Sequence, residues 1–254
     1  ETLVRKILPR LTYLRINISA GEAERYKEIM GAREGMFEQV CRNIEYMVEF
    51  KRKGYTDCTI GMQMVFLPSF EDQLISLSQL ALDLGVDYLV IKHCSDDEFG
   101  TLGVKYGDYE RCYPSLKAAE SMSTERTRIV VKWSKIRECS SHGAIRSYNA
   151  CLGTPFLLQI SGTGLVAPCG MLFNERYKDF HMGNITKQSF KEIWESDHYW
   201  NIIRKLSGPE FNAQTMCGSL CLQHSVNKFL DEYKKGQRKL TPPKGNTPEH
   251  IDFI

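Results

Sequence analysis

The sequence predicts an α/β fold with a parallel sheet, followed by a small cysteine-rich domain. Two observations support this. From Leu11 to about Trp133, short β-rich runs alternate with amphipathic stretches, which is the pattern of successive βα units. Four of the nine cysteines then lie beyond residue 150. Because the sequence has no secretory features, this clustering indicates metal binding or redox chemistry and not a disulfide framework.

Four runs in the first half have the length and composition of strands. Each combines β-branched, aromatic or other apolar residues. The predicted strands are Leu11–Ile18, Asp57–Phe66, Val86–His93 and Arg128–Trp133.

Amphipathic helices are expected between these strands. Phe37–Lys53 places Val40, Ile44 and Met47 on one face, and Asp72–Leu84 repeats leucine at helical spacing. Gly85 comes just before the next strand, where a glycine readily takes the left-handed conformation that ends a helix. The two segments are therefore predicted to be crossover helices that cover the sheet.

A second module is expected to begin near Cys151, after a polar linker that is rich in small residues. Glycines between two apolar runs predict a hairpin, and two later stretches have helical periodicity. The predicted elements are hairpin strands Phe156–Ile160 and Leu165–Ala167 and helices Phe190–Leu206 and Leu222–Tyr233. The final residues are charged and interrupted by prolines, as expected of an extended tail.

The composition argues against two classes of partner. The 254 residues include 33 lysines and arginines and 31 aspartates and glutamates, which leaves a formal charge of +2. Nucleic acid is not an expected partner, because its binders displace phosphate counterions with a concentrated basic face. No apolar run approaches the roughly 20 residues of a membrane-spanning helix. We therefore expect a cytoplasmic protein with no membrane partner.

The clustered cysteines have the pattern C-x17-C followed by C-x3-C. Cys151 and Cys169 flank the predicted hairpin, and Cys217 and Cys221 precede the last predicted helix. Four thiolates can hold a [4Fe–4S] cluster or a structural zinc ion, since cysteine sulfur is a ligand of both. The spacing alone does not choose between these two centres.

Residues after Cys151 resemble the SPASM and twitch auxiliary domains of radical S-adenosylmethionine (SAM) enzymes. Cys151, Gly164 and Cys169 fit the C-x(9–15)-G-x4-C opening of those domains. The stretch from Gly183-Asn184-Ile185 to Ser196 is similar to their G-N-I…F…I-W-x-S run, and Asn227–Leu230 continues the similarity. The resemblance covers about the last hundred residues.

The resemblance implies one auxiliary [4Fe–4S] cluster, with Cys151, Cys169, Cys217 and Cys221 as its ligands. A full SPASM domain adds a C-x2-C-x5-C-x3-C block for a second cluster, and that block is missing here. The twitch-like arrangement, with a single cluster held by four protein thiolates, is therefore expected.

The preceding half resembles the later strands of the partial (β/α)6 radical SAM barrel. The segment Arg15-Ile16-Asn17-Ile18-Ser19 is similar to the R-V-S-I-D run of the fourth strand. Asn17 then stands where the family uses a serine near the SAM ribose, and Ser19 replaces the usual aspartate, so both are candidate SAM-binding residues. The expected organisation is barrel 1–138, linker 139–150, auxiliary domain 151–235 and tail 236–254.

The C-x3-C-x2-C loop that binds the SAM-cleaving cluster in this family is not in the sequence. We therefore expect the chain to be part of a larger enzyme and to be inactive alone. The resemblance implies that the intact protein uses SAM and a second [4Fe–4S] cluster to abstract hydrogen from a substrate through a 5′-deoxyadenosyl radical.

In that reading the auxiliary cluster accepts or relays an electron, and a net oxidation or dehydrogenation is preferred. Flavodoxin or ferredoxin is the expected reductant, and the substrate can be a peptide, a sugar or a nucleotide. The alternative is a non-catalytic α/β scaffold or binding module, stabilised by zinc or a cluster.

Polar residues at the ends of the predicted strands are candidates for substrate contact, because barrel chemistry is placed at the carboxyl ends of strands. The candidates are Gln63, Lys92, His93, Ser95 and Lys132. A solvated strand-to-helix loop has the same residue types, so these residues can equally be ordinary loop residues without a role in substrate binding.

Overall fold

The computed structural model describes residues 1–96, 100–137, 139–140, 143–144, 146–217 and 221–242. The chain divides into two compact units. The first is built from Glu1–Cys94 and Val104–Arg137, and the second from Ser95–Gly103 and Glu138–Lys244. Most of the predicted tail, from residue 243 onward, lies outside the described residues.

The first unit contains a four-stranded sheet in the order β1-β2-β3-β4. Every neighbouring pair of these strands is parallel, which confirms the predicted α/β class. The strands are β1 Tyr13–Asn17, β2 Thr59–Phe66, β3 Tyr88–His93 and β4 Arg128–Val131. All four lie within the runs predicted from composition.

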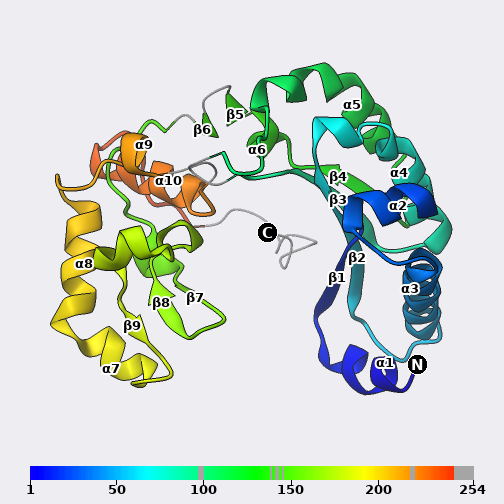
Figure 1. Cartoon of the computed structure of the whole chain (residues 1–254), viewed down its shortest axis with the longest axis horizontal. Coiled ribbons are helices and arrows are strands. Elements are labelled where there is room, and N and C mark those ends of the chain that lie inside the picture. The colour runs from blue at the N-terminus through cyan, green and yellow to red at the C-terminus, as the bar shows by residue number, and fades with distance from the viewer. Residues whose placement is uncertain (97–99, 138, 141–142, 145, 218–220, 243–254) are drawn as a thin grey trace. The chain divides into compact units, whose positions relative to one another are not determined.

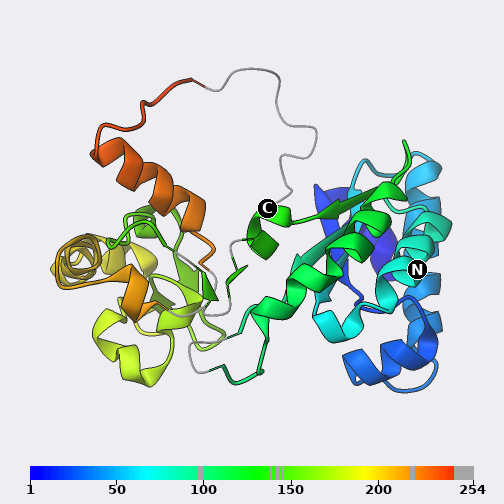
Figure 2. The same ribbon diagram turned by 90° about the horizontal axis from the view of Figure 1, so that it is seen from above.

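Helices cover one side of this sheet, as Figures 1 and 2 show for α3, α4 and α5. The helices of the unit are α1 Thr2–Ile7, α2 Ala23–Met30, α3 Met36–Arg52, α4 Gln73–Leu84, α5 Tyr113–Ser121 and α6 Trp133–Arg137. Gly85 ends α4 with φ +66°, the left-handed conformation predicted for it. Ile60, Met62, Met64 and Phe66 alternate along β2 and are fully buried, so they form the centre of the core.

The fourth strand is shorter than predicted. It ends at Val131, although the Lys132 amide still donates to the Ile91 carbonyl of β3 at 3.0 Å. Helix α6 begins at Trp133, and the Ile136 amide closes its first turn on the Lys132 carbonyl at 3.1 Å. Trp133, the last residue of the predicted strand Arg128–Trp133, therefore belongs to a helix.

The second unit is built around a three-stranded antiparallel sheet in the order β7-β8-β9. The predicted hairpin forms its first two strands, and β9 joins as a third that was not predicted. The strands of the unit are β5 Cys139–Ser140, β6 Gly143–Ala144, β7 Gln159–Ile160, β8 Leu165–Ala167 and β9 Gly183–Asn184.

The helices of the second unit are α7 Phe190–Glu195, α8 Asp197–Ser207, α9 Ala213–Met216 and α10 His224–Lys234. The predicted single helix Phe190–Leu206 is thus wrong, because the chain breaks at Ser196 (φ −77°, ψ 144°). The Ser196 hydroxyl accepts the Tyr199 amide at 3.2 Å and caps a new helix, which is a role that serine favours over the helix interior.

The core of the second unit lies between the small sheet and α7 and α8. Val166, Ile193 and Tyr199 are completely buried in it, and Cys151, Cys169 and Cys217 pack against it. No helix in the described part of the chain is both long and apolar enough to cross a bilayer.

Candidate metal centre and polar sheet face

The four clustered cysteines line a single cavity of about 270 Å³ in the second unit. Four different segments bring them there. Cys151 follows the linker, Cys169 follows β8, Cys217 follows α9 and Cys221 precedes α10. The Cys151 amide donates to the Leu206 carbonyl at the end of α8 at 2.9 Å, so the first ligand segment is fixed to the helical part of the unit.

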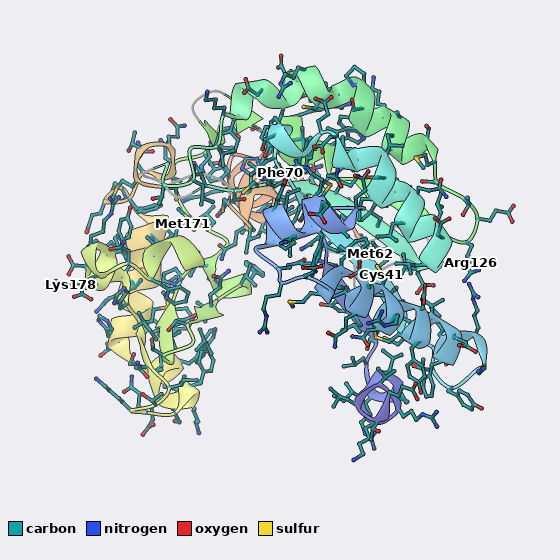
Figure 3. The ribbon with its side chains drawn as sticks, turned by 45° about the vertical axis from the view of Figure 1, so that its right-hand side comes forward. Cys41, Met62, Phe70, Arg126, Met171 and Lys178 are labelled. Atoms are coloured by element: carbon teal, nitrogen blue, oxygen red, sulfur yellow. The ribbon has the colours of Figure 1, made fainter. Side chains whose placement is uncertain are left out.

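Cys169 lies at the start of a single 3₁₀ turn, Gly170–Leu172. Burial raises the pKa of the Cys169 thiol to about 11, and the nearby backbone amides of Met171 (Figure 3) and Leu172 act in the opposite direction. Amide donors of this kind stabilise a thiolate that binds a metal.

Cys217 is the second strongly buried thiol. Burial raises its pKa to about 12, and the nearby Arg146 acts in the opposite direction. Because metal ligands are thiolates, both sulfurs must lose a proton when a cation binds. A positively charged metal centre in the cavity would supply the stabilisation that burial removes.

Asn227, on α10, contacts two of the four sulfurs. Its Nδ2 atom lies 3.8 Å from the Cys151 sulfur and 3.9 Å from the Cys221 sulfur. Its Oδ1 atom accepts the amides of Leu152 and Gly153 at 2.6 and 2.7 Å. The side chain is only 1% exposed, so this amide joins the segments of the first and last cysteine inside the protein.

Gln223 makes a second link between α10 and the hairpin side of the cavity. Its Nε2 atom donates to the carbonyls of Leu157 and Pro168 at 2.6 and 3.2 Å. Its Oε1 atom lies 3.8 Å from the Cys151 sulfur. The cavity is thus closed by side-chain amides whose polar atoms are paired, as buried polar groups require.

His224 contacts Tyr148, which lines the cavity. The Tyr148 hydroxyl and His224 Nδ1 are 3.2 Å apart, and both residues are buried. Burial raises the pKa of the Tyr148 phenol well above its ordinary value, with a further contribution from Cys221. His224, three residues after Cys221, therefore faces a tyrosine hydroxyl.

Gly164 fixes the hairpin between the first two cysteines. It has φ +80°, and a β-carbon there would lie 2.7 Å from the Thr186 methyl and 2.8 Å from Asn184 Oδ1. Only glycine combines this backbone angle with such a close approach. The glycine of the C-x(9–15)-G-x4-C pattern thus holds β9 and the residues after it against the hairpin.

The donor set of the cavity fits an iron–sulfur cluster. All four candidate ligands are thiols, and no disulfide joins the cysteines that the structure describes. Among those same residues, no three His, Cys, Asp or Glu side chains are grouped closely enough to hold one metal ion. The cavity volume of about 270 Å³ also far exceeds the roughly 10–15 Å³ of space that one water molecule requires.

A polar network lies on the helix-free face of the sheet in the first unit. The Gln63 side chain donates to Asn17 Oδ1 at 2.5 Å and accepts from the Arg15 guanidinium at 3.5 Å. Arg15 Nε also donates to the Tyr88 hydroxyl at 3.0 Å. Residues paired across β1, β2 and β3 point to the same face, so the network joins three strands.

Lys92 and Lys132 lie on the same face, two residues beyond Val90 and Val130 on neighbouring strands. Burial lowers the pKa of both ammonium groups, and Arg15 lowers it further. Gln63, Lys92 and Lys132 therefore lie on one face of the sheet.

The other candidates lie elsewhere. His93 points to the opposite face, where its ring is 6.4 Å from that of the buried Tyr109. Ser95 belongs to the second unit and lines the thiol cavity. The Ser19 hydroxyl is buried and accepts the Val65 amide at 3.3 Å.

Comparisons with known proteins agree with these features. Residues 151–221 match the SPASM domain, described as an iron–sulfur cluster-binding domain, and the match begins and ends on a candidate ligand. The AdoMet-dependent heme synthase of Oleidesulfovibrio alaskensis is 25% identical over 224 residues, which cover 83% of this chain. The chain therefore contains a SPASM domain and is similar to an AdoMet-dependent enzyme.

Two solved structures of proteins bound to S-adenosylmethionine share its fold. SuiB of Streptococcus suis bound to S-adenosylmethionine has a TM-score of 0.54 at 14% identity, with 78% of this chain and 46% of SuiB covered. His-tagged anSMEcpe with bound AdoMet has a TM-score of 0.50 at 14% identity, with 92% and 65% covered. The match covers 54% of the length of the heme synthase, so the chain spans about half of that relative.

Sequence reasoning missed several residues around the SPASM cysteines. The sequence indicates Asn227 only as part of a family motif. No sequence pattern indicates Gln223, Tyr148 or Arg146, because their roles depend on contacts between segments that are distant in the chain. Arg15 and Tyr88 were missed for another reason. Arg15 lies in the middle of β1 and Tyr88 is the first residue of β3, whereas the strand-end rule considers only the carboxyl ends of strands.

Proposed function

We propose that this chain supplies the substrate side and the auxiliary cluster of a radical SAM enzyme. In this proposal the intact protein abstracts hydrogen from a bound substrate through a 5′-deoxyadenosyl radical, and the net reaction is an oxidation. The observation that carries the proposal is the meeting of four cysteines from four segments in one cavity of a SPASM domain.

Cys151, Cys169, Cys217 and Cys221 are the proposed ligands of one [4Fe–4S] cluster. When bound, such a cluster supplies a one-electron acceptor or relay close to the substrate. The residues of this chain set its surroundings. Asn227 donates toward two sulfurs, the amides after Cys169 donate toward a third, and the buried wall limits the access of water.

The helix-free face of the sheet is the proposed place for SAM and substrate. Asn17 and Ser19 are proposed to contact SAM, and Gln63, Lys92 and Lys132 to contact the substrate. His93 faces the core in this chain, so its proposed role is indirect, through the packing of β3. A flavodoxin or ferredoxin is the proposed external reductant.

Reconstitution of the chain with iron and sulfide tests the cluster assignment. We expect brown protein with about four irons per chain and an electron paramagnetic resonance signal after reduction with dithionite. Cys169→Ala and Cys217→Ala should lose most of the bound iron. Cys41→Ala is the matched control, because Cys41 lies on α3 in the other unit (Figure 3).

Two outcomes would overturn the proposal. Colourless protein that holds one tightly bound zinc ion would favour the structural scaffold. Equal iron loss in Cys41→Ala and Cys217→Ala would show that iron does not bind at the four proposed ligands.

A further inference from the structure

A threonine hydroxyl lies beside the sulfur of the first candidate ligand. Thr154 Oγ1 is 3.3 Å from the Cys151 sulfur, and Thr154 is only 1% exposed. Within the described residues, this hydroxyl makes no other hydrogen bond. A buried hydroxyl group needs a hydrogen-bond partner, and the partner of this one is the Cys151 sulfur.

The chain between Cys151 and Thr154 is held in place by its backbone. The two residues between them, Leu152 and Gly153, both donate their amides to Asn227 Oδ1, at 2.6 and 2.7 Å. Asn227 is itself 1% exposed and lies on α10. Because these bonds fix the turn, the hydroxyl is placed beside the sulfur whether or not the thiol carries a proton.

The direction of the hydrogen bond depends on the state of the sulfur. A thiol can itself donate, and Gln223 Oε1 lies 3.8 Å from the Cys151 sulfur as an acceptor for its proton. A sulfur that binds iron is a thiolate without a proton, so it can only accept. The Thr154 hydroxyl must then be the donor, together with Asn227 Nδ2 at 3.8 Å.

We propose that Thr154 is a positioning residue of the auxiliary cluster, whose hydroxyl donates to the Cys151 thiolate and raises the reduction potential of the cluster. This inference rests on the proposed function, which assigns a [4Fe–4S] cluster to the four cysteines. Reduction makes the cluster and its sulfurs more negative, and a hydrogen-bond donor to sulfur stabilises the more negative state. A higher potential favours the cluster as the acceptor of the electron that a net oxidation releases.

The test compares reduction potentials of the reconstituted full chain and its variants, measured by potentiometric titration with electron paramagnetic resonance detection. Thr154→Val replaces the hydroxyl by a methyl group of similar size. It should make reduction about threefold to tenfold less favourable, where a tenfold change corresponds to about 59 mV for one electron. Thr154→Ser keeps a hydroxyl and should keep the potential of the unaltered chain.

Thr127→Val is the matched control. Thr127 is also 1% exposed, and its hydroxyl donates to the Val86 carbonyl at 2.7 Å. It belongs to the first unit, which does not contain the four cysteines. The same substitution there removes a buried hydroxyl bond, so it should lower the stability of the chain and leave the reduction potential unchanged.

Equal potentials in Thr154→Val and Thr127→Val would leave Thr154 only a structural role. A shift in Thr154→Ser as large as in Thr154→Val would remove the hydroxyl as the cause. If Thr154→Val takes up no iron, Thr154→Ala should show the lower potential in its place. Loss of iron in both, with normal uptake in Thr154→Ser, would make the hydroxyl a requirement for assembly and overturn its effect on potential.

Iron content separates this inference from the proposed function. An unaltered chain that takes up no cluster would refute the proposed function and the inference with it. Normal iron content in Thr154→Val with an unchanged potential would refute the inference alone.

Discussion

Asn227 is the residue on which the proposed cluster site depends most, apart from the cysteines. One end of its amide donates toward the sulfurs of Cys151 and Cys221. The other end accepts the amides of Leu152 and Gly153, directly after Cys151. The same side chain thus positions the segment of one proposed ligand and directs its N–H group toward the sulfurs of two.

We predict that Asn227→Leu lowers the reduction potential of the reconstituted cluster by tens of millivolts, because N–H donors to sulfur stabilise the reduced, more negative state. The same change should lower the free energy of unfolding by about 1–3 kcal/mol, since two buried amides lose their acceptor. A potentiometric titration and a urea melt measure the two effects.

Asn201→Leu is the control for Asn227, because Asn201 is exposed on α8 and its side chain accepts a hydrogen bond from the nearby Arg204. A potential in Asn227→Leu that matches this control would remove the tuning role. A merely structural Asn227 would change the unfolding curve and leave the potential where it was.

Lys92 carries a partly buried positive charge on the helix-free face of the sheet. Burial and Arg15 lower its pKa in the folded chain. Below that folded-state pKa the lysine is charged in both states, so the full penalty on stability is present. As pH rises from there toward the ordinary value of about 10.4, the folded chain loses the proton first and the penalty is relieved.

We therefore predict that Lys92→Met raises the free energy of unfolding at neutral pH by about 1 kcal/mol. The gain should shrink near pH 10, where the unaltered lysine is becoming neutral. Lys117→Met on exposed α5 should change little at either pH. Destabilisation by Lys92→Met at pH 7 would contradict a penalty from the partly buried charge of Lys92.

At the scale of elements, the hairpin β7–β8 is the part of the second unit that a single glycine controls. Gly164 has a left-handed backbone and touches the residues after β9. We predict that Gly164→Ala destabilises the chain by about 1–3 kcal/mol and reduces cluster loading, because Cys151 and Cys169 flank this hairpin. Thermal unfolding and iron content measure the two effects.

Gly162, two residues earlier in the same turn, provides the matched control. A β-carbon at Gly162 meets nothing within 4 Å, and its φ is not in the left-handed region. Gly162→Ala should therefore behave like the unaltered chain. If both variants lose the same stability, the close packing at Gly164 is not the cause.

The sequence predicts elements well where one face is continuously buried. All four strands of the large sheet and both named crossover helices form where composition and periodicity place them. Hydrophobic periodicity does not predict the break at Ser196, because the spacing of apolar residues continues from α7 into α8. The helix is interrupted only by the N-cap at Ser196. Strand β9 has two residues, too few for a period.

At the scale of the whole molecule, the two units differ in how much of their chemistry the sequence could predict. The site of the second unit can be predicted from cysteine spacing and family motifs, because both are local in the sequence. The first unit assembles its polar face from residues such as Arg15, Gln63 and Lys92, and only strand pairing places them on the same face. His93 was chosen by the same rule as Lys92, but strand alternation turns it to the other face.

Native mass spectrometry of the anaerobically reconstituted chain tests the central claim most directly. If Cys151, Cys169, Cys217 and Cys221 hold one [4Fe–4S] cluster, the folded chain should gain about 350 Da, and Cys217→Ala should lose that species while Cys41→Ala keeps it. A gain of about 65 Da from a single zinc ion, or a cluster mass that persists in Cys217→Ala, would contradict the account.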